Sequence, residues 1–306
     1  MTKNRLFLAQ SQPHIFISHK KLNRSLKNSF ANIKQKVNIN DMKITFLGTG
    51  GGRIVITNQL RASGGFILEI DNKLLHIDPG PGALVKANEY GIDLKKLDGL
   101  LISHAHPDHH SDAEMIIEAM TDGTRVKRGF LIGNYYLDKG DSNFRQIISP
   151  YHLKLVEKYF VMSSGDSVDI EGLKITATPT SHGEPKGIGF IIKGSETFGY
   201  TSDTEYFDGL EKYFKNCDCI VLNVLRTKGH SWPKHMNSDQ AAELLKEAKP
   251  KIAIIQHFGM RMLKVRPETE AKWIEKQSGV KTIAAKDGVV LNLNKIEEKG
   301  LEKWIK

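Results

Sequence analysis

The run Ser103-His104-Ala105-His106-Pro107-Asp108-His109-His110 places four histidines and one carboxylate within eight residues. Neutral imidazole and carboxylate are the ligands that borderline divalent cations such as zinc prefer. The run follows the apolar segment Leu100-Leu101-Ile102, which has the composition of a short buried strand, and Pro107 argues against a helix that continues through it. We therefore predict a metal site on a loop at the end of a strand. A solvated histidine-rich loop is the alternative.

The spacing within this run predicts two groups of ligands. His104 and His106 are two residues apart on extended chain, so their side chains point the same way. Asp108 and His109 directly precede a helical pattern over residues 111–120, which Ser111 or Asp112 is able to cap. The second pair would project from a different backbone direction, as two adjacent metal ions require.

The composition is that of an ordinary globular protein, with 306 residues, 40% of them hydrophobic and 26% charged. No apolar run is long enough to cross a bilayer, so we expect no membrane-spanning segment. The two cysteines, Cys217 and Cys219, are too close for an unstrained disulfide on extended chain. We expect them to be reduced core residues in a reducing, cytoplasmic compartment, with metal binding as the alternative.

The formal net charge of +9 is concentrated near the N-terminus. Eight of the 44 Lys and Arg lie in residues 1–40, which contain no Asp or Glu, and this leaves 36 basic against 35 acidic residues elsewhere. We expect residues 1–41 to be a basic extension and residues 42–306 to be one folded domain. Three interpretations of the extension stay open: sequence upstream of a true start at Met42, a disordered arm, or an organellar transit peptide.

The rest of the chain alternates strand and helix signals. A glycine-rich loop over 48–53 lacks both the Gly-Lys-Ser/Thr ending and a following helix pattern, so a phosphate-binding P-loop is not expected. We expect strands over 43–47, 65–70, 73–77, 99–103, 129–132, 173–178, 187–192, 197–201, 219–225 and 252–255, and a terminal hairpin over 281–293 turned at Asp287-Gly288. We expect helices over 83–90, 111–120, 150–159, 204–215, 237–249 (capped by Ser238) and 267–278. A strand meander followed by helices occurs twice, which predicts two packed β-sheets with helices outside.

Three further polar residues, His182, Asp203 and His257, follow predicted strands, where side chains meet at a sheet edge. With these residues the chain resembles the metallo-β-lactamase fold superfamily from Met42 to about Leu293. The resemblance rests on Ser-His-Ala-His-Pro-Asp-His, His182, Ser202-Asp203-Thr204 and His257-Phe258, with Asp78 in Ile77-Asp78-Pro79-Gly80 matching a supporting position. It implies an α/β fold, the four-layer αββα sandwich, and two divalent metal ions, with zinc expected and manganese or iron as alternatives. It implies one metal on His104, His106 and His182, another on Asp108, His109 and His257, and Asp203 as the bridge.

The resemblance also implies hydrolysis by metal-activated water, with Asp108 and His235 as the catalytic residues. Two divalent ions, two carboxylates and one hydroxide leave a net positive site, so we expect a small anionic substrate or a short nucleic-acid end, and we allow for a homodimer. His235 resembles the active-site histidine of ribonuclease Z-like phosphodiesterases, which contacts phosphate and protonates the leaving oxygen. An ordinary loop histidine is the alternative. We expect His110 on the surface or supporting the site, His230 as a weaker catalytic candidate, and solvated loop charges or phosphate contacts at Arg53, Arg61, Arg226, Lys228 and Arg261.

One departure limits the ribonuclease Z resemblance. That family carries a long tRNA-gripping arm between the positions matched by His182 and Asp203, whereas here 20 residues, Gly183 to Ser202, lie between them. Phosphodiester hydrolysis is therefore the preferred interpretation, and tRNA 3′-end processing is less favoured. A lactone or thioester hydrolase is the enzymatic alternative. A binding role for the basic extension is disfavoured because the ligand set is complete.

Overall fold

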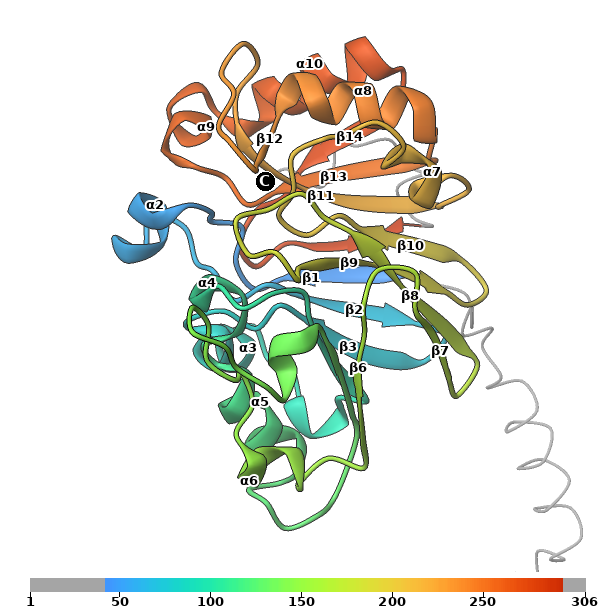
Figure 1. Cartoon of the computed structure of the whole chain (residues 1–306). Helices are drawn as coiled ribbons and strands as arrows, with labels where there is room; N and C mark the ends of the chain where they lie inside the picture. Colours follow the sequence, from blue (N-terminus) through green and yellow to red (C-terminus); the bar gives the residue numbers. More distant parts are fainter. Residues whose placement is uncertain (1–41, 294–306) are drawn as a thin grey trace, which may run out of the picture. The chain divides into compact units, whose positions relative to one another are not determined.

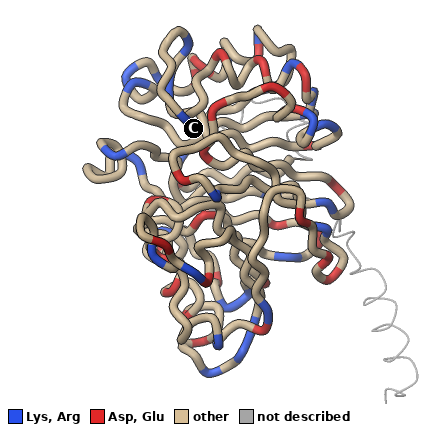
Figure 2. Tube along the Cα trace, in the orientation of Figure 1, with Lys and Arg blue, Asp and Glu red and all other residues tan. Residues whose placement is uncertain are grey.

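The computed structural model describes residues 42–293, which lie within one compact unit. The predicted basic extension over residues 1–41, with its three interpretations, lies outside the described residues. No helix in residues 42–293 has the length and apolar character needed to cross a membrane. Figure 2 shows basic and acidic residues interspersed along this part of the chain, which agrees with the near balance of charge predicted for it.

Two β-sheets form the centre of the fold (Figure 1). The first has the strand order β15-β1-β2-β3-β4-β5-β6, and the second has the order β14-β13-β11-β10-β9-β8-β7 with β12 beside β11. The first sheet contains β1 (Lys43–Phe46), β2 (Phe66–Ile70), β3 (Lys73–Ile77), β4 (Gly99–Ile102), β5 (Phe130–Gly133), β6 (Lys158–Val161) and β15 (Val290–Asn292). The second contains β7 (Ser167–Ile170), β8 (Leu173–Pro179), β9 (Ile188–Lys193), β10 (Thr197–Tyr200), β11 (Cys219–Arg226), β12 (Met236–Asn237), β13 (Ile252–Gln256) and β14 (Lys281–Ala284).

Helices cover the outer faces of both sheets (Figure 1). Those packed on the first sheet include α3 (Ala83–Glu89) and α5 (Ala113–Met120), and those on the second include α8 (Ser238–Ala248) and α10 (Pro267–Ser278). Shorter helices lie in the connections: α2 (Arg53–Thr57), η1 (Leu94–Lys96), α4 (Pro107–His110), η2 (Tyr135–Leu137), α6 (Pro150–Leu153), α7 (Glu211–Phe214) and α9 (Met260–Val265). The predicted four-layer αββα sandwich is confirmed.

Side chains along the central strands point alternately to the two faces of each sheet, and this alternation separates the layers. In β2, Phe66, Leu68 and Ile70 belong to the core between the two sheets, whereas Ile67 packs in the core under α3 and α5. In β11, Cys219 and Val221 face the first of these cores, and Ile220, Leu222 and Val224 pack beneath α8 and α10. Strands buried on both faces are largely apolar, which is why these segments carry nearly continuous hydrophobic runs.

Two pairs of predicted strands, 65–70 with 73–77 and 187–192 with 197–201, form antiparallel hairpins. Asp71 and Asn72, with φ of 47° and 62°, make the turn between the antiparallel strands β2 and β3. Strands β9 and β10 are also antiparallel. The cysteines are free and buried as predicted, and burial raises the pKa of the Cys217 thiol to about 12.

The predicted terminal hairpin over 281–293 is wrong. Strand β14 pairs parallel with β13 in the second sheet, whereas β15 pairs antiparallel with β1 in the first. The turn at Asp287-Gly288 therefore carries the chain from one sheet to the other. Turn residues indicate a reversal of direction, but they do not specify which open sheet edge each strand joins.

Two predicted helices are much shorter than expected. Only residues 150–153 of the segment 150–159 are helical, because Lys158–Val161 instead forms β6 against β5, and β7 was not predicted. The segment 204–215 contains only α7, which begins after Gly209, a residue with φ of 94° that interrupts a helix. Aromatic and β-branched residues in Lys158–Val161 favour the sheet.

Smaller corrections concern helix starts. Pro107 opens α4 at its first turn, so the cluster does include a short helix, and α2 follows the glycine loop where no helix was expected. Asn237, and not Ser238, caps α8 through a capping box with Gln240. Neither of the proposed caps of α5 acts as one: Asp112 occupies its N-cap position, but its carboxylate accepts a hydrogen bond from the Leu84 amide at 3.0 Å.

Candidate metal centre

Parallel strands bring the predicted ligands to one edge of the two sheets. Strands β3, β4 and β5 run parallel in the first sheet, and β10, β11 and β13 run parallel in the second. Asp78 follows β3, the His104–His110 run follows β4, Asp203 follows β10 and His257 follows β13. Because the carboxyl ends of parallel strands share an edge, residues far apart in the sequence meet there.

The structure brings together the two groups of ligands predicted from the sequence. In each group the potential ligand atoms lie within 4.8 Å of one another. The first group is His104, His106 and His182, and the second is Asp108, His109 and His257. Two overlapping groups also meet this criterion: Asp78, His104 and His109, and His182, Asp203 and His235.

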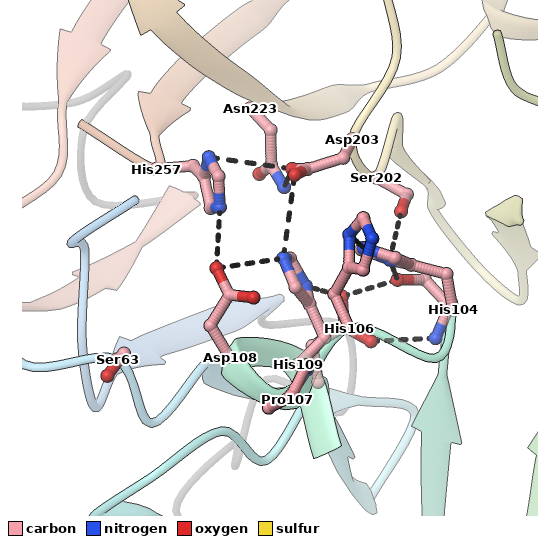
Figure 3. A network of polar contacts seen from close by, with 12 residues as sticks. Ser63, His104, His106, Pro107, Asp108, His109, Ser202, Asp203, Asn223 and His257 are labelled. Atoms are coloured by element: carbon pink, nitrogen blue, oxygen red, sulfur yellow. Dashed lines mark hydrogen bonds and ion pairs between the residues drawn. The ribbon is translucent and has the colours of Figure 1, made fainter. Parts of the chain in front are cut away.

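Asp203 lies against both predicted groups, and Figure 3 shows its contacts with His109 and His257 of the second. Its Oδ2 is 3.9 Å from His182 Nε2 of the first group and 3.7 Å from His109 Nε2 of the second. Its Oδ1 is 3.5 Å from His257 Nδ1. One carboxylate thus lies within 4 Å of ring nitrogens from both groups.

The donor atoms fit a cation chemically. The side chains are largely buried, yet His109 Nε2 and His257 Nδ1 have no hydrogen-bond partner within residues 42–293. Buried ring nitrogens are normally paired, because leaving one unpaired costs free energy. Nε2 of both His104 and His182 also faces His106 Nδ1, at 3.1 and 2.9 Å respectively. Converging imidazole nitrogens beside carboxylates form a donor set suited to zinc and similar ions.

Burial and neighbouring charges together set the protonation states of this cluster, and the Asp108 and Asp203 carboxylates outweigh burial to raise the pKa of His109. Burial, with a smaller contribution from neighbouring histidines, lowers the pKa of His104 well below its usual range and that of His106 to about 4, so these rings are neutral and able to coordinate. Burial also opposes ionisation of Asp108 and Asp203, but attraction to His109 and His257 outweighs it and lowers the pKa of both carboxyls.

Asp78 orients the second group. Its carboxylate accepts hydrogen bonds from the Ser103 amide and hydroxyl and from the Tyr200 hydroxyl, each at 2.7 Å, and it lies 2.8 Å from His109 Nδ1. A proton on His109 Nδ1 leaves Nε2 directed at Asp108 and Asp203. The supporting role implied for Asp78 therefore agrees with its contacts.

Several supporting residues were missed by sequence reasoning. Asn223 donates from Nδ2 to Asp203 Oδ1 at 2.7 Å, and its own Oδ1 accepts from Gln256 Nε2 at 3.0 Å. Glu184 is fully buried and accepts from Asn134 Nδ2 at 2.7 Å and the Ala105 amide at 3.4 Å, which ties the His182 loop to the His104–His110 run. A polar residue inside the apolar segment 219–226 was the available signal for Asn223.

His235 joins the cluster from the loop before α8. Its Nδ1 lies 3.5 Å from Asp203 Oδ2, and its ring is 4.8 Å from that of His182. Burial lowers the pKa of His235 to about 4 despite the attraction of Asp203. The low value favours a neutral ring that donates a hydrogen bond over a cationic one.

The remaining candidates lie around this cluster in different roles. His110 Nε2 is 3.3 Å from the Ala105 carbonyl and belongs to none of the ligand groups found in residues 42–293. His230 is exposed in the loop before β12. Of the basic residues expected on loops, Arg53 and Arg261 instead lie on α2 and α9, Arg226 ends β11, Arg61 pairs with Asp287, and Lys228 covers Trp273.

A buried cluster of imidazoles and carboxylates at the shared edge of two packed sheets defines a metal-dependent hydrolase of the metallo-β-lactamase fold. Residues 74–258 match the model described as the β-lactamase superfamily domain, and the chain belongs to that superfamily. It is 37% identical over 257 residues to a protein of Methanocaldococcus jannaschii described as uncharacterised, covering 82% of this chain and 95% of the relative. It is 26% identical over 225 residues to the probable metallo-hydrolase YhfI of Bacillus subtilis, covering 72% and 89% respectively.

Solved structures agree on the fold. The crystal structure of Bacillus subtilis YhfI matches with a TM-score of 0.67 and 22% identity, covering 82% of this chain and 99% of that one. A structure described as a diphosphatase from the PhnP family matches with a TM-score of 0.58 and 22% identity, covering 82% and 96%. The short form of human tRNase Z matches with a TM-score of 0.60 and 16% identity, covering 82% and 99%.

Proposed function

We propose that this hydrolase binds two metal ions and cleaves phosphodiester bonds. The position of Asp203, within 4 Å of nitrogens from both ligand groups, is the observation that carries the proposal. His104, His106 and His182 would hold one ion, Asp108, His109 and His257 the other, and Asp203 would lie between them. Metal ions bound there would supply Lewis acidity and lower the pKa of a bound water toward neutrality.

Charge supports an anionic substrate. Two carboxylates, Asp108 and Asp203, offset only part of the charge of two divalent ions, so the loaded site stays positive. The Asp108 side chain is 21% exposed against 3% for Asp203, which leaves Asp108 accessible to accept a proton from an attacking water. His235 supplies a ring N–H beside Asp203, where it would donate to a phosphate oxygen.

The comparisons support the same bond class. Two of the similar structures are described as a tRNase Z and a diphosphatase, both named for action on phosphate linkages. Strands β9 and β10 occupy half of Gly183–Ser202, and the remaining residues form the short connections before, between and after them, which leaves little room for a protruding arm. We therefore expect a small anionic substrate or a short nucleic-acid end, and weak or absent tRNA processing. We also expect zinc as the metal, with manganese or iron as alternatives, and a cytoplasmic location.

The test is a substrate panel. Metal-loaded protein and its Asp108→Ala variant would be assayed against bis(nitrophenyl) phosphate, a cyclic nucleotide, a phosphomonoester, a lactone, a thioester, a chromogenic β-lactam and a precursor tRNA. We expect turnover of phosphodiesters that is lost in Asp108→Ala. Turnover confined to lactones or thioesters would refute the bond class, and efficient tRNA cleavage would refute the expectation drawn from the missing arm.

A further inference from the structure

Arg226, the last residue of β11, stacks on Trp232 in the loop between β11 and β12, and neither residue belongs to the candidate metal centre. The guanidinium carbon of Arg226 lies 4.5 Å from the centroid of the Trp232 ring. Trp232 is 51% exposed, so much of the indole is open to solvent. Arginine stacked on an aromatic ring is held in place while the rest of the ring stays free for another flat group.

Arg226 has no anionic partner within residues 42–293. Its Nε is buried and lacks a hydrogen-bond acceptor. The other arginines of residues 42–293 either pair, as Arg61 does with Asp287 and Arg128 with Asp98, or are exposed. A partly buried guanidinium whose Nε lacks an acceptor is costly, and the usual solution is an anion. The described chain supplies none, so this feature points to an anion from a ligand.

The pair lies one tight turn from the metal cluster. Trp232 and His235 form an antiparallel bridge, and the His235 amide donates to the Trp232 carbonyl at 3.2 Å. His235 in turn lies 3.5 Å from Asp203. Residues 226–238 include Arg226, Lys228 and Lys234 but no Asp or Glu, and with Lys234 paired to Glu205 at 2.9 Å, Arg226 and Lys228 supply the positive charge of this segment.

We propose that Trp232 and Arg226 form a nucleotide subsite next to the metal centre. A base of the substrate stacks on the indole, and a phosphate adjacent to the cleaved one contacts the Arg226 guanidinium. This rests on the proposed phosphodiester hydrolysis and narrows its substrate class. A single-stranded oligonucleotide end carries both a base and a second phosphate and therefore fits this subsite. A cyclic mononucleotide lacks the second phosphate. Stacking of bases on aromatic side chains recognises single strands with little sequence preference.

Kinetics test the subsite with two matched substrates. One is the nitrophenyl ester of a thymidine dinucleotide, which has bases and a second phosphate, and the other is methyl nitrophenyl phosphate, which has neither. Trp232→Ala should reduce kcat/KM about tenfold on the dinucleotide ester, mainly through KM, and leave the methyl ester unchanged. Trp232→Phe should keep most of the activity, and Arg226→Gln should lose activity on the dinucleotide ester alone. Equal losses on both esters, or no loss, would overturn the subsite.

Fluorescence tests binding independently of turnover. The chain has three tryptophans, so the matched variants Trp232→Phe and Trp273→Phe remove one emitter each. A short oligothymidylate should quench the emission of the Trp273→Phe protein but not that of the Trp232→Phe protein, and tripolyphosphate should quench neither. Equal quenching in both variants, or none, would overturn the subsite. Quenching without hydrolysis of any phosphodiester would support the subsite while refuting the proposed function.

Discussion

Asp203 is the side chain on which both groups of candidate ligands converge. We predict that the parent protein purifies with close to two metal ions per chain and that Asp203→Ala retains less than half an ion, because it removes the carboxylate that contacts both groups. Elemental analysis measures this. His110→Ala is the matched control, since His110 lies in the same run but outside the ligand groups, and it should keep the parental content. Unchanged metal content in Asp203→Ala would contradict the two-metal interpretation.

His235 lends itself to a test by choice of leaving group. If it protonates or donates to the leaving oxygen, His235→Ala should cost about a hundredfold in turnover on an alkyl leaving group and much less on nitrophenolate. The measurement is kcat on two diesters that differ only in that group. Equal losses would assign His235 to positioning through Asp203, 3.5 Å away, and an unchanged rate would make it an ordinary loop residue.

At the residue scale, the sequence predicted the side chains that share one dense motif or end a strand. His104, His106 and Asp108 stood in a single run, and the contacts of Asp78 agree with its expected supporting role. Asn223 and Glu184 could not be predicted, because their function depends on which distant side chain each one reaches. A buried amide is recognised as a partner of a carboxylate only when the two strands are placed side by side.

The loop from Gly48 to Ser63 is the element that confines the second ligand group. Asp287 secures it by accepting hydrogen bonds from the Thr49 amide at 2.9 Å, the Thr49 hydroxyl at 2.6 Å and the Ala62 amide at 2.8 Å. Within the loop, the Gly51 amide donates to the Phe258 carbonyl at 3.1 Å. The backbone at Gly51 is therefore packed directly against the His257 segment.

A methyl group at Gly51 has no room. A Cβ there would lie 2.3 Å from His257 Nδ1 and 2.4 Å from the His257 carbonyl oxygen, so we predict that Gly51→Ala displaces this ring, lowers metal content and reduces turnover at least tenfold. Gly183→Ala is the control, because Gly183 follows His182 directly yet its Cβ would meet nothing within 4 Å. Metal analysis and rates on both variants check this. Parental values for Gly51→Ala would show that the loop yields without disturbing His257.

Helices and turns that depend on residues close in sequence were predicted well. Strands whose place depends on pairing with a distant strand were not. The β2–β3 turn and α10 depend on residues close in sequence. Strand β6 depends on the open edge of β5, and the last two strands join different sheets because β13 and β1 each had a free edge. No pattern within residues 150–161 or 281–293 specifies those partners.

At the scale of the whole molecule, buried histidines link stability to pH. Burial lowers the pKa of His76 to about 4, from an ordinary value near 6.5. Between these values the unfolded chain binds a proton that the folded chain does not, so the free energy of unfolding should fall as pH drops from 6.5 to 4, on the order of 3 kcal/mol for this residue. Urea unfolding of the chelator-treated protein at pH 7 and 4.5 measures it.

His76→Gln is the variant that isolates this effect. Its amide is still able to donate to the Gly64 carbonyl, which lies 2.8 Å from His76 Nε2, but it does not titrate. The variant should therefore lose less stability than the parent over the same pH interval, with the remaining loss coming from His106 and other buried histidines. The same pH dependence in both proteins would show that His76 does not contribute.

A truncation tests how much of the chain the fold and site require. Every described strand and every candidate ligand lies after residue 41, so deletion of residues 1–41 should leave the melting temperature and the rate unchanged. The comparison is between the full chain and a protein that starts at Met42. A large loss in either quantity would mean that the folded domain depends on residues 1–41.

The pairing of β1 with β15 has a consequence for how the protein is made. Of the described strands, β1 leaves the ribosome first and β15 last, although Ile44 and Leu291 are partners in the finished sheet. Asp287, which secures the Gly48–Ser63 loop, emerges equally late. A nascent chain can therefore carry all of its histidines and still lack the last support of the His257 segment. Tight metal capture should therefore wait until Asp287 and β15 have emerged and joined the fold, so that metal binding follows the pairing of β15 with β1.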